Sequence, residues 1–198
     1  NEMKSNTGEG RQALQQARLL GVAGKVDEAI AAYEKLYGGV PDDVDVAIEY
    51  WTLVARLPAR HSEGVSQLKK LNASAPGNVS LLTSLAKQMF ADNKPQEGFA
   101  YLAEMARSAS GRGIAADMWF SEVKSMPVSK TSVQALQQFL LQFPTGSVAA
   151  NARVLLDQQQ AQLQDPTFRA RSEGLAAVKS GNASQAVADL QKAGQVDS

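Results

Sequence analysis

Residues 26–41, VDEAIAAYEKLYGGVP, contain the spacing that decides the fold of this chain. A small residue, Ala29, is followed four positions later by Tyr33 and twelve positions later by Pro41. The pattern recurs three more times, with the small residues 35, 34 and 34 positions apart. The later sets are Gly64, Leu68 and Pro76; Gly98, Leu102 and Ser110; and Ser132, Leu136 and Pro144. One structural unit is therefore used several times along the chain.

A period near 34 residues is typical of the tetratricopeptide repeat, a helix–turn–helix unit that buries its apolar face only by stacking on its neighbours. The chain has 198 residues, is rich in alanine and glutamine, and contains seven prolines, which favours helix. No segment alternates between apolar and polar residues for long enough to indicate a strand. We therefore predict an all-α superhelix (an α-solenoid) of about five helix pairs.

The period also predicts the boundaries of these units. The next matching small residue after Ser132 is Ala186, which lies 54 positions on, about 20 more than one period. We expect residues 1–9 to be disordered or the remnant of a preceding helix. Four repeats follow at 10–41, 42–76, 77–111 and 112–144, then a linker and unpaired helix at 145–164, and a fifth repeat at 165–198 where the array is cut short.

The inserted segment is predicted to change the direction of the array. Residues 147–164 are good helix formers and would span roughly 27 Å as one helix. Pro144, Thr145 and Gly146 precede this helix and form a predicted hinge.

The sequence offers no constellation for catalysis, so we expect a protein that is not an enzyme. There is no cysteine, and the single histidine, His61, falls in the turn of repeat two, where a surface histidine is expected. The acidic run at 42–45 follows a proline at a helix start, where carboxylates complement the helix dipole. Residues 111–113, Gly-Arg-Gly, are interpreted as an inter-repeat turn because they lack the rest of a phosphate-binding loop. No catalytic residue, cofactor or metal ligand is predicted.

Charge and hydropathy argue against two classes of partner. Twenty basic and twenty acidic residues cancel, and no basic stripe suits a phosphate backbone, so nucleic acid is not expected. No apolar run approaches the ~20 residues that span a bilayer, so this chain is not expected to insert into a membrane.

The first helices of such an array line its concave face, which is the predicted partner-binding groove. Tyr50 and Phe90 fall at positions that point there, and each is either a contact to the next repeat or a platform for a ligand such as a sugar. Trp51 and Trp119 are expected in the core. The polar residues of the face have mixed charge, which suits a peptide or protein. The predicted groove comprises Arg18, Glu49, Tyr50, Lys87, Phe90, Asp117 and Lys124.

Several stretches carry a resemblance that is more specific than the generic repeat. They are residues 10–19, 49–51, 67–72, 75–78, 97–100, 126–129, 165–171 and 174–178. Together they resemble the periplasmic repeat region of the bacterial cellulose synthase operon protein C family, enterobacterial type. The resemblance covers nearly the whole chain, and the run 165–178 and the position of the unpaired helix are its most specific parts.

The resemblance implies a location and a role. The family's full protein looks like a long periplasmic repeat array that is joined to an outer-membrane β-barrel, through which the glucan made by the inner-membrane synthase is exported. It implies no catalytic residue in this chain. The resulting hypothesis is a non-catalytic periplasmic scaffold that docks other cellulose synthase subunits between the synthase and the export pore. The alternative is a glycan-binding module that guides the nascent cellulose chain.

Overall fold

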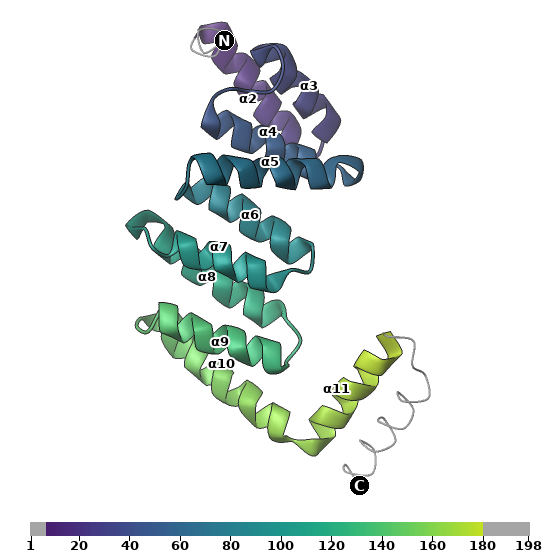
Figure 1. The fold of residues 1–198 in the computed structure, drawn as a ribbon, viewed down its shortest axis with the longest axis vertical. Helices are drawn as coiled ribbons and strands as arrows, with labels where there is room; N and C mark the ends of the chain where they lie inside the picture. Colours follow the sequence, from purple (N-terminus) through teal and green to yellow (C-terminus); the bar gives the residue numbers. More distant parts are fainter. Residues whose placement is uncertain (1–6, 180–198) are drawn as a thin grey trace. The chain divides into compact units, whose positions relative to one another are not determined.

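The computed structural model describes residues 7–179, which form ten α-helices and one short 3-10 helix and contain no strand. The chain divides into two compact units, 1–115 and 116–198, whose boundary falls within α8. The first unit contains α2 (Gly8–Val22), α3 (Val26–Tyr37), α4 (Val44–Arg56), α5 (His61–Ser74), α6 (Val79–Ala91) and α7 (Pro95–Met105). After α8 (Ala109–Ser125), the second unit continues with α9 (Lys130–Gln142), α10 (Ser147–Gln164) and α11 (Pro166–Lys179) (Figure 1).

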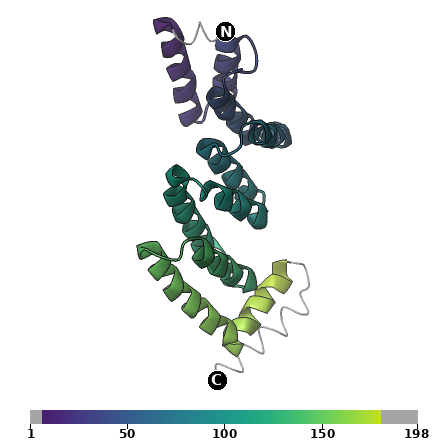
Figure 2. The same cartoon turned by 60° about the vertical axis from the view of Figure 1, so that its left-hand side comes forward.

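Helices of the first unit form three pairs in sequence order. The pairs α2–α3, α4–α5 and α6–α7 make the closest packing, and α3–α4 and α5–α6 join one pair to the next. Figures 1 and 2 show these helices side by side in both views. The prediction of an all-α chain built from helix pairs is confirmed for the residues that the structure describes.

Short polar side chains fix where the first helices of the repeats begin. The side chains of Thr7, Asp43 and Asn78 accept hydrogen bonds from backbone N–H groups three residues later, at 3.0, 3.1 and 3.0 Å. These contacts satisfy donors that a helix start leaves without an intrahelical partner. The acidic run at 42–45 therefore lies at a helix start, as predicted, and Asp43 caps that helix.

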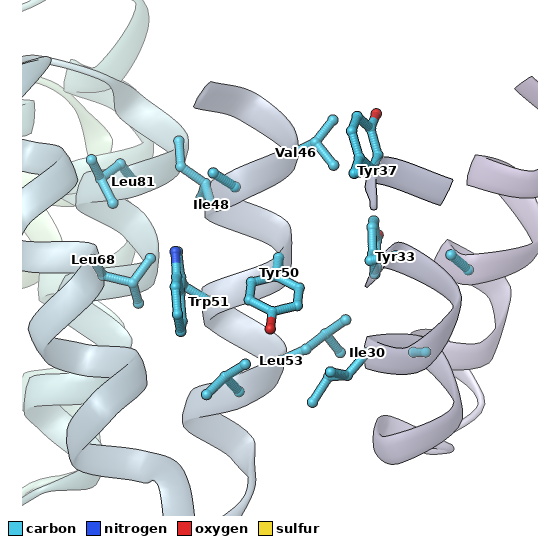
Figure 3. Close-up of a cluster of buried hydrophobic side chains, with 14 of the residues drawn as sticks. Ile30, Tyr33, Tyr37, Val46, Ile48, Tyr50, Trp51, Leu53, Leu68 and Leu81 are labelled. Carbon is cyan, nitrogen blue, oxygen red and sulfur yellow. The ribbon is translucent and has the colours of Figure 1, made fainter. Parts of the chain in front are cut away.

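The core of the first unit lies between the two helices of each pair and between adjacent pairs. Figure 3 shows Tyr50, Trp51 and Leu53 on α4, with Leu68 on one side and Tyr33 on the other. All five side chains are at most 8 % exposed, and the rings of Tyr50 and Trp51 meet edge to face at 4.8 Å. The prediction that Trp51 belongs to the core is confirmed.

The repeated small residue is needed where two helices of a pair approach most closely. A Cβ atom added to Gly64 would lie 2.5 Å from the backbone nitrogen of Ala55. A Cβ atom added to Gly98 would lie 2.6 Å from the ring of Phe90. The spacing that defines the period therefore marks the contact between α4 and α5, and between α6 and α7.

The second unit has an aromatic core. Trp119 is 3 % exposed, donates its indole N–H to the carbonyl oxygen of Ala135 at 2.9 Å, and packs edge-on against Phe139 and Phe143. Trp119 is therefore a core residue, as predicted.

The inserted helix α10 packs against α9 on one side and contacts α11 on the other. Ser132, at the repeated small position of α9, is fully buried and donates to Gln159 of α10 at 2.7 Å. Gln159 is 3 % exposed, although the sequence around it is mostly polar. A buried hydrogen bond therefore holds the two helices together.

The structure corrects one boundary. Helix α8 begins at Ala109, so residues 111–113 lie inside a helix and do not form the inter-repeat turn expected from the sequence. The side chain of Ser108 accepts from the backbone N–H of Gly111 at 3.1 Å, which starts the helix earlier. A Cβ atom on Gly111 would lie 2.5 Å from the carbonyl oxygen of Met105, so glycine permits this start. The predicted second helix of the fifth repeat, after residue 182, and residues 1–6 lie outside the described residues.

Candidate functional site

A hollow of about 450 Å³ opens on the face of the first unit formed by α2, α4 and α6, the first helices of three successive repeats. Its lining residues are Arg18, Gly21, Val22, Tyr33, Ile48, Glu49, Thr52, Leu53, Arg56, Ser80, Thr83, Ser84, Lys87 and Gln88. Thirteen of these fourteen positions come from the three first helices, and only Tyr33 comes from α3.

Helical spacing explains why these side chains share one face. Glu49, Thr52 and Arg56 lie three and seven positions apart on α4, and therefore fall on one stripe of that helix. On α6, the same holds for Ser84, which follows Ser80 by one turn, and for Lys87, which follows Ser84 by one turn.

Charged and polar contacts join α2 to α4 at one side of the hollow. The guanidinium of Arg18 lies 3.0 Å from one carboxylate oxygen of Glu49, and the other oxygen accepts a hydrogen bond from the hydroxyl of Tyr33 at 3.0 Å. The hydrogen bond with Glu49 raises the pKa of Arg18. Burial and the neighbouring carboxylate raise the pKa of Tyr33, so Tyr33 remains a neutral donor. The positive charge of Arg18 is therefore neutralised within the protein.

Hydroxyl groups join α4 to α6 in the middle of the hollow. The hydroxyl groups of Thr52 and Ser84 lie 2.8 Å apart, and that of Thr52 also donates to the carbonyl oxygen of Ile48 at 2.6 Å. Arg56, one turn beyond Thr52, donates to the carbonyl oxygen of Gly21 on α2 at 3.0 Å. The three first helices are thus linked in order along this face.

Three of the predicted groove residues, Arg18, Glu49 and Lys87, line the hollow. Tyr50 requires a correction, because it is 1 % exposed and its ring packs against Trp51 inside the core. Its hydroxyl donates to Glu34 at 2.7 Å, and burial raises its pKa. Of the two alternatives, Tyr50 is a packing residue and offers no face to a sugar.

Phe90 is half-buried and packs within its own repeat. Its ring meets that of Phe99 edge to face at 5.0 Å and covers Gly98. Phe90 does not line the hollow. The aromatic residues that motivated the glycan-binding alternative are thus both occupied by contacts within the protein.

The remaining predicted groove residues, Asp117 and Lys124, are exposed and belong to the second unit. There the ammonium group of Lys124 lies over the ring of Phe120, 4.9 Å from its centre. No part of the hollow described above involves them.

The predicted hinge residues Pro144, Thr145 and Gly146 are exposed and connect α9 to α10 within the second unit. Gly146 has a φ of 101°, which other residues rarely adopt, and the carbonyl oxygen of Pro144 accepts from Arg153. Motion at this linker stays a prediction.

His61 is more than the surface histidine expected from the sequence. Its ring nitrogens contact two groups: Nδ1 lies 2.6 Å from the carbonyl oxygen of Ala55, and Nε2 lies 2.7 Å from a carboxylate oxygen of Asp92. His61 starts α5 in repeat two and Asp92 is the C-cap of α6 in repeat three, so the contact joins adjacent repeats.

The sequence did not point to Val22, Thr52 and Arg56 or to most of the polar residues of α6. These residues carry no motif, but each lies three or four positions from another lining residue on the same helix. Extending the predicted stripe by whole turns from Glu49 and Lys87 would have found Thr52, Arg56 and Ser84.

Within residues 7–179, no group of three or more histidine or acidic side chains is placed to hold a metal ion. None of the helices in that part combines the length and apolar character needed to cross a membrane.

The fold and the hollow define a class: an all-α helical-repeat protein with a groove along its first helices. A crystal structure of the flexible tandem repeat domain of the bacterial cellulose synthase C subunit matches with a TM-score of 0.67 and 50 % identity, covering 82 % of this chain and 67 % of that chain. The chain therefore belongs to the bacterial cellulose synthase operon protein C family.

Comparison with curated proteins agrees with this assignment. The chain is 49 % identical over 191 residues to cellulose synthase operon protein C of Salmonella typhimurium (strain LT2) and equally to that of Escherichia coli (strain K12). Cellulose synthase 1 operon protein C of Komagataeibacter xylinus is 26 % identical over 190 residues. The first two matches cover 96 % of this chain but 16 % of the length of those relatives. No protein-family model matches the chain.

Proposed function

We propose that this chain is a non-catalytic docking segment of the bacterial machinery that makes and exports cellulose. In this role it scaffolds other cellulose synthase subunits in the periplasm, between the inner-membrane synthase and the outer-membrane export pore. Membership of the operon protein C family supports the connection to cellulose synthesis. The observation that carries the docking role is the hollow lined by the first helices of three successive repeats.

The physical form of the hollow suits a protein surface. Its lining includes the buried side chains of Ile48 and Leu53 together with hydroxyl, amide and charged groups. Val22 lines it with 87 % of its surface exposed, which leaves apolar area to be removed from water by a partner.

Calorimetric titration tests this function directly. The 198-residue chain is titrated with the purified periplasmic regions of the other cellulose synthase subunits, and at least one is expected to bind with a dissociation constant of about 1–100 μM. Val22→Glu places a charge in the hollow without touching the core and is expected to weaken binding at least about tenfold. The matched control is Leu141→Glu, at a residue of α9 that is 74 % exposed and distant in sequence from the hollow.

Absence of binding to every subunit would contradict the scaffold role, and equal effects of the two substitutions would contradict docking in the hollow. Titration with cello-oligosaccharides addresses the alternative: binding that Val22→Glu abolishes would favour a glycan-guiding role. The proposed location is tested by fractionating cells that carry the tagged, full-length protein, where recovery in the cytoplasm would contradict it.

A further inference from the structure

Two basic side chains of the hollow, Arg56 and Lys87, form no ion pair with an acidic group of the described residues. The hollow is lined by three cations, Arg18, Arg56 and Lys87, and one carboxylate, Glu49. Glu49 pairs with Arg18, whereas Arg56 donates to the neutral carbonyl oxygen of Gly21. The structure gives no ion pair for Lys87 among residues 7–179.

The register of α4 against α6 places Arg56 and Lys87 at a similar level along the two helices. Thr52 contacts Ser84, and further along the chain His61, at the start of α5, contacts Asp92, which caps the C-terminus of α6. Both helices therefore run in the same direction. Arg56 follows Thr52 by four positions and Lys87 follows Ser84 by three, so each lies about one turn, ~5 Å, beyond the contact between the hydroxyl groups.

Apolar surface lies next to this pair of charges. Leu53 precedes Arg56 by three positions on α4 and lines the same hollow. Gly21, which accepts the hydrogen bond from Arg56, is followed by the exposed Val22 on α2. The lining therefore offers both positive charge and aliphatic surface to a ligand.

We propose that this hollow binds an acidic peptide segment of a partner protein, with a carboxylate placed between Arg56 and Lys87 and an aliphatic side chain against Val22 and Leu53. The inference rests on the docking function proposed above and names the chemistry of the partner. Charge complementarity favours this occupant, because the lining has three cations and one carboxylate, and the carboxylate is paired with Arg18. The aliphatic surface favours a peptide over a small inorganic anion.

Fluorescence anisotropy with the whole 198-residue chain tests the proposal. The probe is a labelled peptide of about ten residues built from glutamate, leucine and serine, and the comparison peptide carries glutamine in place of glutamate. The acidic probe is expected to bind at least about tenfold more tightly at low salt, and its affinity is expected to fall as the salt concentration approaches ~0.5 M. Equal binding of the two peptides would overturn the proposal.

Three substitutions locate the site. Lys87→Gln and Arg56→Gln are each expected to weaken binding of the acidic probe about fivefold. Lys70→Gln is the matched control, since Lys70 is an exposed lysine on α5 that does not line the hollow, and it is expected to leave the affinity unchanged. Because Arg56 also contacts Gly21, Lys87→Gln decides the result if Arg56→Gln lowers the stability. If Lys70→Gln lowered the affinity for the acidic probe as much as Lys87→Gln, the proposed position of the site would be wrong.

Two further arms separate the alternatives. Lys87→Glu is expected to bind a lysine-containing version of the probe better than the wild-type chain does, which a general loss of structure would not produce. If inorganic phosphate displaces the acidic probe when the two are present at equal concentration, the site binds anions in general and the peptide proposal is overturned. If a cellulose synthase subunit still binds Lys87→Gln as tightly as wild type while Val22→Glu abolishes binding, docking stands and the acidic-segment inference fails.

Discussion

At the scale of single residues, the contact that His61 makes between two repeats depends on the protonation state of its imidazole ring. A backbone carbonyl oxygen and a carboxylate only accept hydrogen bonds, so a ring that contacts both is best satisfied when both nitrogens carry protons. The hydrogen bond with Asp92 is the largest cause that raises the pKa of His61, followed by that with the Ala55 carbonyl, while burial and the charge of Lys94 oppose them. The contact between repeats two and three is thus strongest with the imidazolium form.

We therefore expect the stability contributed by His61 to depend on pH. A raised pKa in the folded state means that this contribution is complete below the unfolded pKa of about 6.5 and is lost as the pH rises through the folded pKa. The side chains of His61 and Asp92 are 28 % and 27 % exposed, so the contribution is about 1 kcal/mol. Urea unfolding of wild type and His61→Gln at about pH 5.5 and about pH 9 measures it, and a difference that does not change with pH would contradict this interpretation. Asp92→Asn is expected to weaken the dependence.

The repeated small residues lead to a second expectation at this scale. Gly64→Ala would force its Cβ atom to within 2.5–2.8 Å of three atoms of Ala55, two of them backbone, and is expected to cost about 1–3 kcal/mol. Gly113→Ala in α8 is the matched control, because nothing lies within 4 Å of the new atom and alanine favours helix by up to about 1 kcal/mol. Thermal unfolding compares them. A Gly64→Ala chain as stable as Gly113→Ala would show that the period does not mark close contacts.

At the scale of helices, some boundaries can be predicted from the sequence because caps and turns depend on local residues. The acidic run that contains Asp43 was recognisable as a helix start, and the structure has Asp43 as the cap of α4. The start of α8 was placed too late, since the close approach of Gly111 to Met105 depends on packing that sequence spacing does not reveal. For the same reason a buried Gln159 in a polar helix could not be foreseen: its partner, Ser132, lies 27 residues away.

The contact between α9 and α10 is expected to depend on that pair. Ser132→Ala removes the donor and leaves the buried amide of Gln159 without this partner, which costs about 1–3 kcal/mol. Gln159→Leu alone is expected to be similarly harmful, while the double variant is expected to lose less than the sum of the two. Denaturant unfolding of the four chains gives the coupling free energy. Strict additivity would mean that the hydrogen bond does not couple the helices.

At the scale of the whole molecule, the sequence predicted the class of fold better than the site. The period depends on residues that every repeat needs for its own packing, and these residues can therefore be recognised in the sequence. The hollow depends on residues such as Thr52, Arg56 and Ser84, whose types do not recur from repeat to repeat. They come together only when α4 packs against α6. Tyr50 was misplaced because one helical position separates the groove stripe from the core, and its ring lies on the core side.

The predicted hinge at Pro144, Thr145 and Gly146 belongs to this scale, because it would redirect everything that follows it. Spin labels at the exposed residues Gln134 on α9 and Ser172 on α11 are expected to give a broad or multi-peaked distribution of distances. A label pair placed entirely on α9 is the rigid control. A single narrow peak for the first pair would contradict the hinge, and Ser132→Ala is expected to broaden the distribution further.

Packing in the first unit runs from each helix to the one or two that follow it, and this has a mechanical consequence. In the described part of the first unit, the packing contacts join helices that are near neighbours in the sequence. When tension is applied to the ends of such a stretch, one pair of helices can therefore separate while the other pairs stay folded. A stretch held between two anchors would yield in small successive steps and shorten again when released. These stacked pairs are therefore suited to act as a spring as well as a surface.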